Sequence, residues 1–163
     1  QIVDKTRGKL WIPSGALAGI DALLAARQGK IRQVTLTTRK PVSGLAGAPY
    51  LSKKKIQISK IKKPTLVFEG NASRAIQAFP KNINVAATLA LAGLGAKKTR
   101  VRIYASPTYH RNQHEVEIEG DFGRIHTEVE NIPTPDNPRT SRLAILSTVA
   151  ILKKIFGRVS VGT

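Results

Sequence analysis

Three consecutive runs in the C-terminal half alternate between apolar and polar residues, and they constrain the fold more than any other feature. They span Thr99–Ala105, Gln113–Glu119 and Phe122–Glu130. An alternation with a period of two is typical of β-strands. Gly120-Asp121 separates the last two runs and is a hairpin-turn signal. The pattern therefore predicts a meander of three strands.

The rest of the chain mixes extended and helical patterns. Ser14 and Asn71 stand where N-cap residues are favoured, each before a helical stretch. We expect further strands at Lys9–Ile12, Ile31–Arg39 and Thr65–Glu69, and helices from Ser14 to Arg27, Asn71 to Ala78, Asn84 to Leu94 and Thr140 to Phe156. This order predicts an α+β fold with a mixed, largely antiparallel sheet and helices on one face.

Two segments carry specific expectations about exposure. Leu51–Lys63 is rich in lysine and isoleucine, and we interpret it as an exposed edge strand whose lysines oppose aggregation. Thr140–Phe156 has apolar residues almost all round a helix, so we expect it to be well buried. Arg158–Val161 is an extended piece that could add to a sheet, and Lys40–Pro49 is expected to be a loop.

Composition excludes several classes of protein. The 163 residues, 41% of them hydrophobic, suit one globular domain with a real core and argue against disorder. The absence of cysteine excludes disulfide and thiol chemistry and fits a reducing compartment, so we expect a cytoplasmic protein. The apolar stretches Val85–Gly95 and Leu143–Leu152 are too short to span a bilayer. Methionine is absent even at position 1, so we expect a processed, truncated or excised piece in which Gln1 is not the natural translation start.

The formal net charge of +17 is the most unusual property of the composition. It fits either a binder of polyanions such as nucleic acid or a basic surface that meets anionic substrates. Lysines cluster at positions 53–55, 60, 62 and 63, and no aromatic residues lie between them to stack on bases. We therefore favour the second interpretation and expect neither nucleic acid nor membrane as a partner.

Of the three histidines, His114 is the strongest candidate for chemistry. It follows Asn112 at the entrance of an alternating strand, where a side chain with a pKa near 6.5 can accept and return a proton. His126 lies within the last strand and suits a structural role. His110 lies in a loop, and the residues next to it in the sequence do not indicate a site. Three histidines without cysteine give no zinc-ligand spacing, so we expect no metal site.

Polar residues also gather before the small-residue helix. Asn82 and Asn84 could each cap it, and only one can do so, which leaves a spare amide. Lys81 could meet a substrate carboxylate or be solvated. Arg139, in Asn137-Pro-Arg-Thr-Ser, could bind a carboxylate, or the motif could be only a helix entry; Arg39-Lys40 offers further candidate cations.

Four motifs in order resemble the catalytic domain of the L-aspartate dehydrogenase family. They are Pro13-Ser-Gly-Ala-Leu-Ala-Gly-Ile-Asp-Ala, the run from Phe79 to Gly95, Arg111-Asn-Gln-His-Glu and Asn137-Pro-Arg-Thr-Ser. The resemblance implies oxidation of L-aspartate to iminoaspartate with NAD or NADP. That imine then hydrolyses to oxaloacetate and ammonia or supplies quinolinate for pyridine nucleotide biosynthesis.

The resemblance also implies roles for particular residues. His114 would be the catalytic acid/base, and Asn84, Ala16 and Gly19 would contact the cofactor. Asn112, Lys81 and Arg139 would contact the substrate. Residues 1–12 would be the tail of a preceding nucleotide-binding domain, and residues 13–163 would form the catalytic and dimerisation domain of a homodimer.

Three alternatives to this interpretation remain. The first is a related amino-acid or semialdehyde reductase domain, and the second is a basic nucleic-acid-binding module. The third is a fragment that is inactive by itself, because the chain contains no G-x-G-x-x-G to bind a cofactor pyrophosphate.

Overall fold

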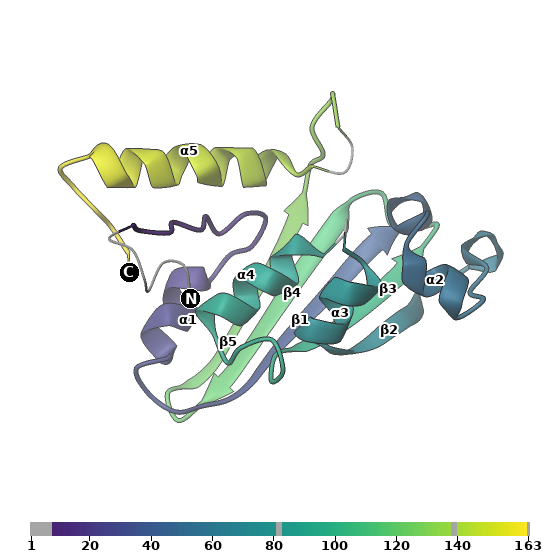
Figure 1. Ribbon diagram of the computed structural model, residues 1–163, viewed down its shortest axis with the longest axis horizontal. Coiled ribbons are helices and arrows are strands. Elements are labelled where there is room, and N and C mark those ends of the chain that lie inside the picture. Colours follow the sequence, from purple (N-terminus) through teal and green to yellow (C-terminus); the bar gives the residue numbers. More distant parts are fainter. Residues whose placement is uncertain (1–7, 81–82, 138–139, 163) are drawn as a thin grey trace.

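The computed structural model describes residues 8–80, 83–137 and 140–162. Figure 1 shows a twisted sheet with helices packed on one face, which confirms the predicted α+β class. The strands are β1 (Ile31–Pro41), β2 (Thr65–Asn71), β3 (Arg100–Ser106), β4 (Asn112–Gly120) and β5 (Gly123–Asn131). The helices are α1 (Ile20–Ala26), α2 (Pro49–Lys53), α3 (Ala72–Ala78), α4 (Asn84–Ala92) and α5 (Arg142–Phe156), with 3-10 turns η2 (Val42–Leu45) and η3 (Ile58–Lys60).

The sheet is mixed and largely antiparallel, as predicted. Its strand order is β2-β3-β1-β4-β5. The central strand β1 runs parallel to β3 and antiparallel to β4. The outer pairs, β2 with β3 and β4 with β5, are antiparallel. The parallel pair requires a crossover, which α2, β2, α3 and α4 provide.

The predicted β4–β5 hairpin is present, and its turn is fastened to β1. Gly120 pairs with Gly123 across a two-residue loop. The carboxylate of Asp121 accepts a hydrogen bond from the Lys30 backbone N–H at 3.1 Å. A side chain at position 120 would place its Cβ 2.7 Å from the Lys30 carbonyl oxygen, so this crossing requires glycine. The contact sets the register in which β1 and β4 meet.

The core lies between the sheet and the helices. Leu36 of β1 and Val116 of β4 face each other across the ladder and are both essentially unexposed. Ala86, Leu89 and Ala90 of α4 are also buried. The small side chains of α4 let this helix approach closely, as its composition predicted.

The prediction of an edge strand at Leu51–Lys63 was wrong. Pro49 occupies the first turn of α2, a position that suits its fixed φ. The helical turn buries Leu51 and places the Tyr50 ring 5.3 Å from the rings of both Phe68 and Phe79. An isolated strand at the sheet edge could not have brought these side chains into one cluster.

The N-terminal prediction was also wrong in two respects. Residues 9–12 form no strand, and the first helix begins at Ile20 rather than just after Ser14. The reason is backbone conformation, because Gly15 and Gly19 have φ values of +67° and +80°. These left-handed glycines interrupt the helix that the apolar spacing suggested.

The predicted burial of the last helix was wrong as well. No residue of α5 is buried, and Leu146, Val149 and Leu152 are 54%, 45% and 50% exposed. Figure 1 shows α5 standing apart from the sheet, above the segment that leads into α1. Residues 158–161 form no strand. No helix among the described residues is long and apolar enough to cross a membrane.

Candidate active site

The inner face of the β1–β4 pair changes from apolar to polar toward one end. Leu36 lies opposite Val116, and one step further Thr38 lies opposite His114. Beyond that pair, the Lys40 Nζ donates a hydrogen bond to the Asn112 Oδ1 at 3.2 Å. Side chains two residues apart share a face of a strand. The hydrophobic core therefore ends in two layers of polar side chains.

His114 is held rigidly in the first of these layers. It is 4% exposed, and its Nδ1 is 3.1 Å from the Thr38 Oγ1. Burial, followed by the positive charge of Lys40, lowers its pKa from 6.5 to about 3. The imidazole is therefore neutral at neutral pH. Its second ring nitrogen, Nε2, has no hydrogen-bond partner among the described residues and is left for a ligand.

Lys40 forms the second layer and is a buried cation. Its side chain is 7% exposed, and burial lowers its pKa from 10.5 to about 8. The group is still mostly charged at pH 7. A buried charge is costly unless a counter-charge meets it, and here Lys40 contacts the amide oxygen of Asn112.

Both layers open into one cavity of about 470 Å³. Its lining comes from the end of β1, the start of β4 and the beginnings of α4 and α5, together with the loops beside them. The described residues that line it are Ser14, Gly15, Ala16, Lys40, Pro41, Ser43, Gly44, Asn84, Val85, Thr88, His110, Arg111, Asn112, His114, Pro133, Thr140, Ser141 and Ala144. None of these is an aspartate or a glutamate.

Four residues singled out from the sequence meet in this cavity: His114, Asn112, Asn84 and Ala16. Asn84 is the first residue of α4 rather than its cap, because Ile83 holds the cap position. Its amide is therefore available to a ligand. His110, which had no evident role in the sequence, also lines the cavity.

Of the remaining predicted site residues, the structure describes Gly19 alone, and Gly19 does not line the cavity. Gly19 lies away from it, where a Cβ would be 3.0 Å from the Thr127 Cγ2 of β5. Lys81 and Arg139 lie outside the described residues, as does Asn82.

Sequence reasoning missed Thr38 and did not single out Lys40 from several candidate cations. Strand parity could have found both, since Val34, Leu36, Thr38 and Lys40 occupy alternate positions of one strand. A lysine on the same face as two core residues must be buried if the strand is central. The central place of β1 in the sheet was not visible in the sequence.

Comparison with known proteins identifies the family of the chain. A family model described as aspartate dehydrogenase, C-terminal, matches residues 21–155. The chain belongs to this family. L-aspartate dehydrogenase of Methanosarcina barkeri is 52% identical over 163 residues, and that of Bradyrhizobium diazoefficiens is 44% identical over 165 aligned positions. The resemblance proposed from four motifs is thereby confirmed.

A solved structure extends the likeness of this aspartate dehydrogenase family member to three dimensions. Aspartate dehydrogenase from Thermotoga maritima matches with a TM-score of 0.76 at 29% identity, over 98% of this chain and 59% of that one. The chain covers 60% of the length of the Methanosarcina barkeri relative and 59% of the Bradyrhizobium diazoefficiens relative. The described cavity residues other than Ser14, Gly15 and Ala16 lie within the part that the family model matches.

Proposed function

We propose that this chain is the catalytic part of an enzyme that oxidises L-aspartate to iminoaspartate with NAD or NADP. The observation that carries the proposal is one cavity holding a buried neutral imidazole, a buried ammonium and two side-chain amides. His114 supplies the acid/base group, while Lys40 and Asn112 offer a cation and an amide to a carboxylate. The names of the relatives support aspartate as the substrate.

The wall of the cavity fits a nicotinamide ring. Ala16, Val85 and Ala144 supply an apolar surface, and Asn84 supplies an amide donor and acceptor for a carboxamide. A Cβ at Gly15 would meet no atom within 4 Å, so this edge of the cavity is open. A nicotinamide held by these residues would supply the acceptor for the hydride that leaves the substrate Cα. Gly19 stays a predicted cofactor contact that would lie outside this cavity.

The chain's own residues would handle the protons and the carboxylates. His114 presents Nε2 to the cavity and can take the proton of a water that attacks the imine carbon. Thr38 holds the opposite nitrogen and fixes the ring. Lys81 and Arg139 stay predicted substrate contacts. The product, iminoaspartate, then yields oxaloacetate and ammonia or enters pyridine nucleotide biosynthesis.

We also propose the organisation of the whole protein. Residues 1–12 would end a nucleotide-binding domain, and residues 13–163 would form the catalytic and dimerisation domain. A cytoplasmic homodimer is the expected assembly. The match covers 60% of the Methanosarcina barkeri relative, and the remainder of that relative has room for such a domain, which supports this division. Sedimentation of the full-length protein tests the dimer.

The assay that tests the function is reduction of NAD and NADP by L-aspartate in the full-length protein. His114→Ala should lower kcat/KM by about a hundredfold or more, the lower range of acid/base catalysis. His126→Ala is the matched control, because His126 is exposed on the outer face of the sheet beside Glu115. Equal losses in both variants, or no activity with aspartate in the wild type, would reject the proposal. Preference for another amino acid or a semialdehyde would favour the related reductases.

A further inference from the structure

The cavity contains a charge that the described residues do not balance. Lys40 is buried and its ammonium contacts the neutral amide of Asn112. The other cation of the lining, Arg111, is already paired, since its Nη1 lies 2.8 Å from the Glu130 carboxylate. A buried ammonium without a carboxylate partner is a strong site for an anionic ligand.

The same ammonium acts on the imidazole beside it. Lys40 and His114, both buried, line one cavity from adjacent strands, and the positive charge of Lys40 opposes a second positive charge on the ring. Without a ligand, His114 is therefore a very weak base. A catalytic base must accept a proton near the working pH. The proton affinity of His114 therefore has to rise when substrate binds.

The surroundings of His114 show that a ligand must bring that change. β1 places Thr38 and Lys40 against the ring, and β5 places Val129 opposite it. The described residues with which α4, α5 and residues 14–16 line the cavity are all uncharged. The loop before β4 adds His110 and Arg111. Glu115, next in sequence to His114, pairs with Arg39 on the other face of the sheet. The described lining therefore contains no carboxylate that could offset Lys40.

We propose that Lys40 binds a carboxylate of the substrate and that this binding enables His114 to take up a proton. The inference rests on the proposed function, because it assigns the dicarboxylate substrate to Lys40. The carboxylate neutralises the ammonium and adds negative charge near the ring, which removes one of the two obstacles to protonation. His114 then accepts a proton through Nε2 only when substrate is seated. Lys40 is thus a substrate-binding residue that also controls the base.

Succinate, a dicarboxylate without the amino group, is the probe for this coupling. In the full-length protein, the His114 ring is followed by ¹H–¹⁵N NMR between pH 5 and pH 8, with and without succinate. We expect a neutral ring down to pH 5 in the free protein and a ring that protonates within this range when succinate is bound. By linkage, each unit by which succinate raises the pKa of His114 means about tenfold tighter binding to the protonated form.

Lys40→Met is the decisive variant, and Lys62→Met is its control because Lys62 is exposed and the substitution is the same. Lys40→Met should weaken succinate binding by about tenfold or more and abolish the succinate-induced protonation, whereas Lys62→Met should change neither. Lys40→Arg should keep part of both effects, since it restores the charge. Unchanged succinate affinity in Lys40→Met, or succinate binding that leaves the His114 ring neutral at pH 5, would overturn the proposal.

The same measurements separate this proposal from the proposed function. If aspartate is not oxidised but succinate still protonates His114 through Lys40, the enzymatic assignment fails and the coupling stands. If aspartate is oxidised and Lys40→Met retains wild-type kcat/KM, the assignment stands and the coupling fails.

Discussion

A single buried imidazole makes the stability of the fold depend on pH. His114 has a pKa of about 3 in the folded protein and an ordinary value near 6.5 when unfolded. Below pH 6.5 the unfolded chain binds a proton that the folded chain refuses, so stability is complete above that pH and is lost as the pH falls toward 3.

This linkage predicts a difference between the wild type and His114→Gln. Between pH 7 and pH 5, the wild type should lose about 2 kcal/mol more free energy of unfolding than the variant does. Urea denaturation of both proteins at the two pH values measures the difference. Parallel losses would mean that His114 is not held neutral.

The buried ammonium of Lys40 lowers the stability of the fold, although the proposed activity requires it. Its burial lowers its pKa to about 8, which means that the fold tolerates the ammonium at a cost. We predict that Lys40→Met raises the free energy of unfolding by about 1–3 kcal/mol at pH 7 while it removes activity with aspartate. Lys62→Met should shift stability by less than about 0.5 kcal/mol. Destabilisation by Lys40→Met would show that the ammonium has a stabilising partner in the fold.

At the level of elements, the segment before α1 depends on one glycine conformation. Gly19 has a φ of +80° and lies so close to Thr127 that a Cβ would be 3.0 Å from its Cγ2. Gly19→Ala should cost about 1–3 kcal/mol through backbone strain and crowding. Gly47→Ala is the control for strain alone, since its φ is +77° with no atom within 4 Å of the new Cβ. Thermal unfolding should rank Gly19→Ala as the less stable variant; the reverse order would contradict the packing of this segment on β5.

The elements also show what the sequence could predict. Alternation identified β3 and β4 because each strand has one buried face, and β5 because half-buried and exposed residues alternate along it. Asn71 was recognisable as a cap, where its Oδ1 accepts from the Arg74 N–H at 2.9 Å. Leu51–Lys63 was misjudged because Leu51 packs in the core from α2 and the isoleucines pack against it from η3 and the loops beside it, a tertiary contact that local spacing does not encode.

The site was predictable to a similar degree. His114 and Asn84 stood out because each is a polar residue at the start of a regular element. Thr38 did not, since a threonine in a strand is ordinary until its neighbour across the sheet is known. Register between strands far apart in the chain, here β1 and β4, is decided by the whole sheet.

At the scale of the whole molecule, charge is distributed unevenly. Six of the ten acidic residues lie on β2, β4 and β5: Glu69, Glu115, Glu117, Glu119, Glu128 and Glu130. Several of them pair with arginines of the same sheet, including Arg39, Arg102 and Arg124. The described cavity lining is left without a carboxylate. The net charge of +17 therefore acts as a positive field around a cavity suited to anions.

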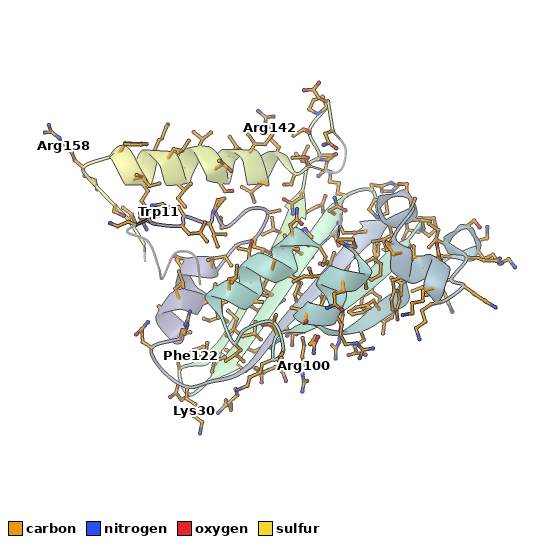
Figure 2. The ribbon with its side chains drawn as sticks, viewed as in Figure 1. Trp11, Lys30, Arg100, Phe122, Arg142 and Arg158 are labelled. Carbon is orange, nitrogen blue, oxygen red and sulfur yellow. The ribbon has the colours of Figure 1, made fainter. Side chains whose placement is uncertain are left out.

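The exposed apolar surface of α5 is the other property of the whole molecule. Leu146 and Leu152 are about half exposed, and Figure 2 shows Trp11 on the segment beneath the helix, with Arg142 and Arg158 near its two ends. Monomeric proteins rarely leave a contiguous surface of this kind uncovered. We predict that residues 1–163, produced alone, self-associate with increasing concentration.

The double variant Leu146→Gln/Leu152→Gln tests which surface is responsible. It should remain monodisperse in sedimentation velocity at concentrations where the unaltered chain associates, with little change in unfolding because neither side chain is buried. Leu91→Gln is the control, since Leu91 is 64% exposed on α4. If Leu91→Gln suppressed association and the double variant did not, the surface responsible for association would lie on α4 and not on α5. If the double variant alone suppresses association, α5 is the element whose apolar side needs a covering.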